Sequence, residues 1–427
     1  MLQVLKSAWP LLLGMMLLMV GNGMQGTLLG VRGGIEEFST FSMSVVMSAY
    51  FVGFLGGSRL APEMIRRVGH VRVFAALGSF ISAVLILYPT VTEPWAWSIL
   101  RVVIGFSFSG VYVTAESWLN NAASNQNRGK ALSLYMMVQM IGIIAAQGIL
   151  AVGEPSGYIL FVIPSVLVSI SFAPILLSVN PTPAFESTKR MDLPGLWSAS
   201  PLGCVGIFLM GGVFSAQFGM AAVYGTIAGL SVGEISAFVA VIYVGAVVLQ
   251  YPIGWLSDRM DRRLLILIVA AVGAVSAGVG IFYDTHYAVL LGVAFMTGGA
   301  ANPLYSLLIA YTNDFLEPED MAAASAGLLF INGVGAIAGP LLTGWLMGAY
   351  GPGGFWLLVS VLMLAVSIYA GWRMTRRPAM AHEDTSAYVS VLPTAGAVAM
   401  EVAQEWAIEH AEAEEALENA AQTSLNP

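Results

Sequence analysis

Long apolar stretches, separated by short polar and charged segments, follow one another along the chain until about residue 373. Most of them have about 20 residues or more, the length that an α-helix needs to cross the hydrocarbon core of a membrane. The strands of a membrane β-barrel would be shorter and would alternate apolar with polar residues. We therefore predict twelve membrane-spanning helices, over residues 9–31, 41–58, 73–92, 95–118, 131–153, 158–179, 201–225, 235–257, 264–283, 287–312, 321–348 and 353–373.

Two uncharged stretches are too long for a single crossing. Leu193–Gly233 holds one span, so its ends are expected at the membrane surface. Met321–Trp372 is divided by Gly351-Pro352-Gly353-Gly354, a sequence typical of a turn between two helices.

Composition agrees with this pattern and excludes a water-soluble domain. Hydrophobic residues make up 57% of the 427 residues, charged residues 10%, and the mean hydropathy is +0.79. Soluble domains carry about 25% charged residues. The single cysteine, Cys204, excludes a disulfide framework and a cysteine-based metal cluster, so we expect no cofactor and no metal.

The formal net charge of −8 belongs to a C-terminal tail. Residues 378–427 contain nine of the 25 acidic residues and no Lys or Arg, which leaves 16 acidic against 17 basic residues in the rest of the chain. We expect this tail to be a cytoplasmic segment, helical from about residue 397 to 420, either solvated or loosely docked on basic loops. No nucleic-acid partner is expected.

Basic residues in the short loops predict the orientation, because cytoplasmic loops are enriched in Lys and Arg. Arg32 lies on the predicted outer side and Arg101 lies inside a span. The other fifteen basic residues fall on one side of the membrane: Lys6, Arg59, Arg66, Arg67, Arg72, Arg128, Lys130, Lys189, Arg190, Arg259, Arg262, Arg263, Arg373, Arg376 and Arg377. We therefore expect both termini in the cytoplasm of a bacterium, with the spans in its inner membrane.

Similar residues recur at half the length of the chain. Gly105, Tyr112 and Asn120 recur 193 positions later as Gly298, Tyr305 and Asn313. At the same offset, Gln139 is matched by Asn332 and Gly142 by Gly335. This repeat favours two related six-helix halves. We expect an N-terminal bundle over residues 1–180, a cytoplasmic linker over 181–200, a C-terminal bundle over 201–377 and the tail over 378–427.

Two short motifs resemble those of the major facilitator superfamily. After the eighth span the chain reads Gly254-Trp255-Leu256-Ser257-Asp258-Arg259-Met260-Asp261-Arg262-Arg263, and the fourth span contains Arg101-x-x-x-Gly105. The corresponding loop of the first half keeps Arg66-Arg67 but has no Asp before them.

Three further segments are similar to the YcaD-like branch of bacterial transporters: Gly21–Leu29, Arg67–Arg72 and Ala115–Asn120. The resemblance implies an all-α integral membrane protein with twelve transmembrane helices in two pseudosymmetric six-helix bundles. It also implies a substrate cavity between the halves near the bilayer midplane and transport by alternating access.

Polar residues within the spans around such a cavity are the candidate substrate-binding residues, because an intramembrane polar group is costly without a partner. They are Asn22, Gln25, Arg101, Tyr112, Gln139, Gln217, Tyr224, Asn302, Tyr305 and Asn332. Asn22 and Gln25 are three residues apart, so they share one helix face. Amides and phenols suit a neutral or weakly charged polar solute. The alternative is that these amides only bind helices to one another.

Arg101 and Glu116 are ionisable residues within predicted spans. Arg101 is expected to attract an anionic substrate, to influence a proton-accepting group, or to extend outward toward Glu93. Glu116 is either a proton carrier or a structural partner of loop arginines. About 22 Å of helix separates the two residues, so they cannot pair with each other.

The loop after the eighth span is a candidate gating element. Asp258, at the end of a helix, can bind Arg259 or Arg262 and the positive amino terminus of a neighbouring helix. Breaking this charge contact would accompany opening toward the cytoplasm. The alternative is that the arginines only set the topology.

The function predicted from these observations is a secondary active or facilitative transporter of a small polar organic solute. The fifth span lacks the Gly-Pro pair typical of drug–proton antiporters, so uptake is favoured slightly over efflux. Protons are a candidate coupling ion for symport, and a monomer in the lipid bilayer is expected. The alternative is a transporter-like sensor or assembly factor that signals through the tail. An enzyme is not expected, because all four histidines fall in loops or the tail.

Overall fold

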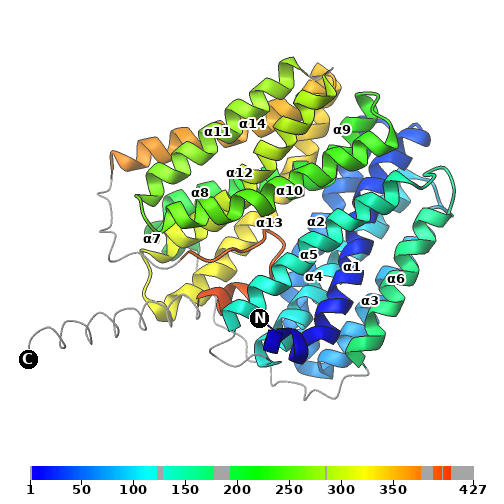
Figure 1. Ribbon diagram of the computed structural model, residues 1–427, viewed down its shortest axis with the longest axis horizontal. Coiled ribbons are helices and arrows are strands. Elements are labelled where there is room, and N and C mark those ends of the chain that lie inside the picture. The colour runs from blue at the N-terminus through cyan, green and yellow to red at the C-terminus, as the bar shows by residue number, and fades with distance from the viewer. Residues whose placement is uncertain are drawn as a thin grey trace, which may run out of the picture.

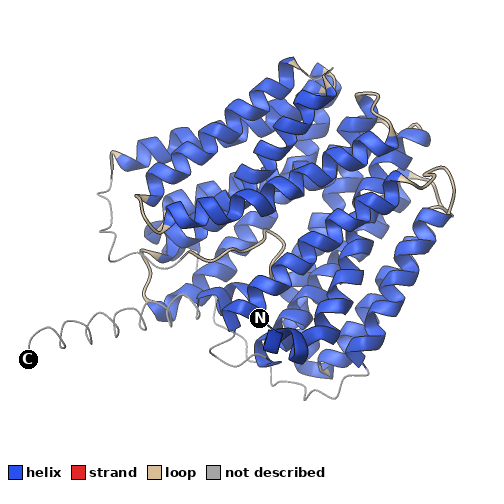
Figure 2. Cartoon of the chain, in the orientation of Figure 1, coloured by secondary structure: helices blue, strands red, loops and turns tan. Residues whose placement is uncertain are grey.

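The computed structural model describes residues 2–122, 128–176, 193–283, 286–376, 388–396 and 398–404, and all regular structure in these ranges is helical (Figure 2). The helices of the first half are α1 (Leu2–Ile35), α2 (Thr40–Val68), α3 (His70–Leu87), α4 (Pro94–Ala122), α5 (Arg128–Ala151) and α6 (Ile159–Leu176). The second half contains α7 (Leu193–Ala199), α8 (Pro201–Ser215), the π-helix η2 (Ala216–Met220), α9 (Ala221–Ile227), α10 (Val232–Ser257), α11 (Arg262–Phe282), α12 (Tyr287–Asn313), α13 (Pro318–Tyr350) and α14 (Gly353–Met374).

The predicted twelve crossings are confirmed. Among the described residues, eleven helical stretches are long and apolar enough to span a membrane, and α6 is a shorter apolar helix. One of the eleven, Pro201–Ile227, combines α8, η2 and α9. The short helix α7 occupies residues that we assigned to the linker, and residues 181–192 lie outside the described ranges.

Local sequence signals set the helix ends. Gly69 follows α2 at φ +84°, and Gly351 follows α13 at φ +70°, a backbone conformation that glycine adopts without strain. The predicted turn therefore separates α13 from α14; it consists of Gly351 and Pro352, and α14 begins at Gly353. At the start of α10, Ser231 and Glu234 form a capping box that satisfies backbone N–H groups of the first turn.

Matching glycine pairs hold equivalent helices together in the two halves. A Cβ atom on Gly53 of α2 would lie 1.9 Å from a backbone oxygen of α4, and one on Gly105 of α4 would lie 2.0 Å from a backbone oxygen of α2. In the second half, Gly245 and Gly298 bring α10 and α12 together with corresponding distances of 2.0 and 2.1 Å. The same close crossing thus appears twice, about 193 residues apart, as the internal repeat predicted.

The two ends of the bundle differ in how closely the halves approach. We call the end that carries Arg66, Arg67, Arg262, Arg263 and Arg373 the basic end. At the opposite end α1 packs against α9: Cβ atoms on Gly30 and Gly34 would lie 2.7 and 2.3 Å from side-chain atoms of Ala222 and Thr226. The two halves are therefore in direct backbone-level contact at that end.

At the basic end, residues 388–396 and 398–404, which we call the C-terminal segment 388–404, lie between the halves (Figure 1). This corrects the expectation of a solvated or loosely docked tail, because Val391, Ala395, Met400 and Gln404 are all buried. The helix predicted from residue 397 is observed over 398–404, and the rest of the tail lies outside the described ranges. The physical reason is that residues 388–400 carry no charge and are mostly apolar, unlike the tail as a whole.

Candidate functional site

Four of the candidate residues form one buried hydrogen-bonded network between α1 and α4. Gln25 Nε2 donates to Asn22 Oδ1 at 3.1 Å, and Asn22 Nδ2 donates to the Tyr112 hydroxyl at 2.9 Å. Arg101 Nη1 donates to Gln25 Oε1 at 2.6 Å. All four residues are at most 1% exposed. The common helix face of Asn22 and Gln25 follows from their spacing, but their partners on α4 do not.

Arg101 is directed into the protein. Its guanidinium lies 4.8 Å from the centre of the Tyr50 ring, and Nη2 is 3.2 Å from Met47 Sδ. The expectation that Arg101 extends outward toward Glu93 is therefore wrong. The amide of Gln25 and the ring of Tyr50 supply attractive partners inside the bundle, so the cation does not need to reach the membrane surface.

An aromatic layer formed by both halves lies beside this network. It consists of Tyr50, Phe51 and Phe54 of α2, Phe214 of α8 and Phe218 of η2. The Tyr50 and Phe218 ring centres are 5.6 Å apart, and those of Phe51 and Phe214 are 6.2 Å apart. Phe218 lies in a π-helical stretch, a distortion often found at functional sites. The layer provides ring faces from both halves at one level of the bundle.

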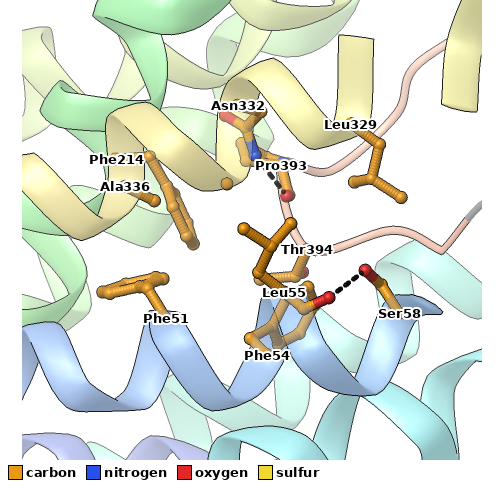
Figure 3. A pocket seen from close by; sticks show the side chains of 11 residues that line it. Phe51, Phe54, Leu55, Ser58, Phe214, Leu329, Asn332, Ala336, Pro393 and Thr394 are labelled. Atoms are coloured by element: carbon orange, nitrogen blue, oxygen red, sulfur yellow. Dashed lines mark hydrogen bonds between the residues drawn. The ribbon is translucent and has the colours of Figure 1, made fainter. Parts of the chain in front are cut away.

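A small pocket adjoins the aromatic layer (Figure 3). Three parts of the chain line it: the two halves and the C-terminal segment. The lining residues are Phe51, Phe54, Leu55, Ser58, Phe214, Leu329, Asn332, Gly333, Ala336, Pro393 and Thr394. The space that remains is about 10 Å³, roughly enough for one water molecule.

Asn332 is the candidate residue that lines this pocket. Its Nδ2 donates to the backbone oxygen of Pro393 at 3.1 Å, the contact drawn in Figure 3. A side chain predicted to bind substrate is therefore engaged with a backbone carbonyl of the chain's own C-terminal segment.

The remaining candidates lie in several places. Asn302 and Tyr305 of α12 and Gln217 of η2 are buried, and among the described residues the Tyr305 hydroxyl and the Gln217 Nε2 have no hydrogen-bond partner. Gln139 is buried on α5, with Nε2 3.7 Å from Met136 Sδ of its own helix. Tyr224 of α9 stacks on Phe355 with ring centres 5.0 Å apart, so it belongs to an aromatic core within the second half.

Glu116, near the basic end of α4, binds the C-terminal segment. Its Oε1 accepts a hydrogen bond from the backbone N–H of Gly396 at 2.9 Å, and its Oε2 accepts one from that of Ala399 at 3.3 Å. Glu116 is 2% exposed. We expected loop arginines as its structural partners; among the described residues its hydrogen-bond partners are these two amides.

The loop after α10 forms the expected ion pair between Asp258 and Arg262, and a second, closer pair between Arg262 and Asp314. Arg262 Nη1 binds Asp314, and both side chains are buried, whereas Arg262 Nη2 is 3.7 Å from the half-exposed Asp258. Arg259 lies over the ring of Trp255 at 4.4 Å. The main charge contact between helices therefore joins α11 to the end of α12.

Asp314 was missed by the sequence reasoning, although a signal existed. It directly follows Asn313, the last repeated residue of the tenth span, and so lies at the same membrane surface as the arginine-rich loop. Asp258 also has a partner that we did not expect. Its Oδ1 accepts a hydrogen bond from the backbone N–H of Tyr388 at 3.1 Å.

Tyr388 anchors the beginning of the C-terminal segment. Gln250 Nε2 of α10 donates to its hydroxyl at 2.6 Å. Burial raises the pKa of the Tyr388 phenol above its usual value, so this group is neutral. Among the described residues, no group of three or more His, Cys, Asp or Glu is placed to hold a metal ion.

Comparison with known proteins identifies the family. The model of the Major Facilitator Superfamily matches residues 11–233 and 202–392. The chain belongs to the Major Facilitator Superfamily. This chain is 28% identical over 344 residues to the MFS-type transporter YcaD of Escherichia fergusonii, and the alignment covers 80% of this chain and 88% of the relative. The YcaD transporter of Salmonella arizonae is 28% identical over 355 residues, with coverages of 82% and 91%.

Solved transporters of similar fold agree with this membership of the superfamily. The structure of a mutant of the nucleoside transporter NupG has a TM-score of 0.74 at 15% identity and covers 85% of this chain and 98% of its own. A bacterial homologue of the human lysosomal transporter Spinster, inward-facing and unoccupied, has a TM-score of 0.65 at 14% identity, with coverages of 94% and 97%. At these identities the likeness concerns the fold. The protein is thus a multi-pass transporter of the superfamily.

Proposed function

We propose that this protein is a secondary active or facilitative transporter that moves a small polar organic solute across a bacterial inner membrane by alternating access, with uptake favoured over efflux. The basic end faces the cytoplasm in this proposal, since cytoplasmic loops are enriched in Lys and Arg. Both termini are then cytoplasmic, and the pocket beside the aromatic layer lies on the path from the cytoplasm to the centre of the bundle.

The observation that carries the proposal is the joint placement of the polar network and the aromatic layer. Arg101 and Gln25 lie behind Tyr50, whose ring contacts Phe218 of the other half. A solute held between the halves would meet ring faces on both sides and amides at their edges. Stacking on such faces and hydrogen bonding to amides together suit a polar molecule with a ring.

The second half would contribute polar side chains that can still form hydrogen bonds with a solute. The Tyr305 hydroxyl and the Gln217 Nε2 are buried without a hydrogen-bond partner among the described residues. A buried polar group without a partner is costly, and a bound solute would supply that partner. We propose Asn302, Tyr305, Gln217 and Asn332 as contacts on this side. Tyr224 is left out because it packs within the second half.

A ligand screen followed by mutagenesis tests the proposal. Purified full-length protein is screened against a library of nucleosides, sugars, amino acids and carboxylates by thermal shift, and a hit is measured for uptake into proteoliposomes. Ala substitutions at Asn302 and Gln217 should weaken binding of the hit, while Ala at Tyr224 should leave its affinity unchanged. Uptake no faster than in empty liposomes for every hit would contradict the proposal.

We further propose that transport is coupled to protons and that the protein is a monomer. A pH gradient imposed across the proteoliposomes should increase uptake if the transporter is a symporter. The mass of the detergent-solubilised protein, measured by light scattering with the detergent contribution subtracted, tests the monomer.

A further inference from the structure

Among the described residues, the Glu116 carboxylate of α4 forms the hydrogen bonds that join the C-terminal segment to the first half. Glu116 accepts the backbone N–H groups of Gly396 and Ala399 at 2.9 and 3.3 Å. A Cβ atom on Gly396 would lie 2.3 Å from Glu116 Oε2, so a larger residue at this position would displace the Glu116 carboxylate from the segment. Gly396 therefore lies directly against Glu116 and Val113 of α4.

The same segment is bound to the second half over most of its length. Ser306 of α12 accepts the Val391 N–H and donates to the Val391 carbonyl, both at 3.0 Å. Asn332 of α13 donates to Pro393, and Gln404 donates to Ser325 of α13. Side chains from α4, α12 and α13 thus pair with one short stretch of chain.

These contacts provide hydrogen-bond partners for backbone N–H and C=O groups that have no partner within the segment itself. Residues 388–396 are not helical, so their N–H and C=O groups need partners from elsewhere. Buried side chains of the cleft supply several of them. With Pro393 and Thr394 in place, the pocket keeps only about 10 Å³, roughly the room of one water molecule.

We propose that residues 388–404 are an intramolecular plug of the transport cleft. While the plug is bound, it excludes solute from the pocket and holds α4 apart from α12 and α13, so that the basic end cannot close. Since alternating access requires this end to close before the opposite end opens, the plug also keeps the opposite end shut. This consequence rests on the proposed transport function.

Tethering makes such a plug effective even when its individual contacts are weak. A segment joined to α14 by a short connection is present near its site at an effective concentration in the mM range. Release would require that these hydrogen bonds and the buried contacts of Val391, Leu392 and Met400 be lost, for instance when a partner binds the tail. The plug would thus regulate transport, and it is distinct from the residues that bind the solute.

Cysteine labelling of the full-length protein tests the plug without a substrate. In a Cys204→Ser background, Ala336→Cys reports on the pocket wall and Thr226→Cys reports on the contact between α9 and α1 at the opposite end. Gly396→Leu is the release variant, because its side chain collides with Glu116. Gly292→Leu is the matched control, since a Cβ atom there meets nothing within 4 Å.

Gly396→Leu should increase the rate of maleimide labelling at both reporter sites by about tenfold or more, the change expected when hydrogen bonds to a buried carboxylate are lost. Gly292→Leu should leave both rates unchanged. Unchanged labelling at Ala336→Cys in the release variant would overturn the plug. A rise at Ala336→Cys without one at Thr226→Cys would overturn control of the opposite end.

A second measurement covers the case in which Gly396→Leu does not fold. A specific protease site is placed within residues 378–387, and the purified, folded protein is cut and diluted, so that the segment loses its tether. The same rise in labelling is expected, and its absence would overturn the plug. If labelling rises but no solute is ever transported, the transport proposal fails and the plug stands; if labelling is unchanged in a protein that transports a solute, the reverse holds.

Discussion

Arg101 and Gln25 are joined by a hydrogen bond of 2.6 Å although they lie 76 residues apart on two different helices. Both side chains are fully buried. A buried cation in a membrane protein is expensive unless polar partners surround it. The network Asn22–Gln25–Arg101–Tyr112 is therefore both a structural element of the first half and a cluster of polar groups behind the proposed cavity.

Removing Gln25 should leave the Arg101 guanidinium with one partner fewer. We expect Gln25→Leu to lower the stability by about 1–3 kcal/mol, the cost of an unsatisfied buried group. Arg101→Met in the same chain should recover part of this loss, because the unpaired cation is gone. A double-mutant cycle on thermal unfolding in detergent measures the coupling. Strictly additive effects of the two substitutions would contradict the contact.

The ion pair between Arg262 and Asp314 should be more important for stability than the contact between Arg262 and Asp258. Asp314→Asn breaks a buried pair and leaves a buried charge, at an expected cost of about 3–5 kcal/mol. Asp258 is half-exposed and 3.7 Å away, so Asp258→Asn should cost less than about 1 kcal/mol. Denaturation of both variants under identical conditions compares them, and equal losses would show that the assignment of partners is wrong.

The close crossing of α2 and α4 should tolerate no side chain at its centre. Gly53→Val places carbon atoms where the backbone oxygen of Val102 lies, and backbone cannot move aside as a flexible side chain can. Overpacking of this kind costs about 1–3 kcal/mol or more. Gly148→Val on α5 is the control, because a Cβ atom there meets nothing within 4 Å. The yield of monodisperse protein and its melting temperature should fall for Gly53→Val alone.

Two tyrosines that occupy repeated positions should respond in opposite ways to loss of the hydroxyl group. Tyr112→Phe removes the bond to Asn22 and should lower the stability by about 1 kcal/mol. Tyr305→Phe removes a hydroxyl without a partner among the described residues and should leave the stability unchanged or raise it. If Tyr305 binds the solute, the same substitution should weaken binding by roughly five- to 150-fold. Thermal shift and equilibrium binding separate the two effects.

The proposed orientation predicts that both termini are reached only from the cytoplasm. Short epitope tags at the two ends should be inaccessible to antibody in intact spheroplasts and become accessible after the membrane is permeabilised. A tag in the loop between α1 and α2 should be accessible without permeabilisation. Periplasmic exposure of either terminus would contradict the orientation.

The positions of the membrane-spanning helices could be predicted from the sequence because they depend on each segment's own composition. About 20 apolar residues favour the membrane wherever they occur in the chain, and the observed crossings agree with this pattern. The turn at Gly351 and the shared face of Asn22 and Gln25 are equally local. The repeated glycines, 193 positions apart, also revealed the pairing of halves without any coordinates.

The choice of partners between helices was decided only by the tertiary structure. Arg101 could have faced Glu93 or the bundle interior, and the loop sequence does not show that Arg262 binds Asp314 more closely than Asp258. Such alternatives differ by a few kcal/mol and depend on how helices far apart in sequence are rotated and packed, which no periodicity along one segment records. The C-terminal segment is the largest example: the net charge of the whole tail predicts a solvated segment, whereas most of the described residues between 391 and 400 are buried between the two halves, because they carry no charge and their apolar side chains are stabilised by leaving water.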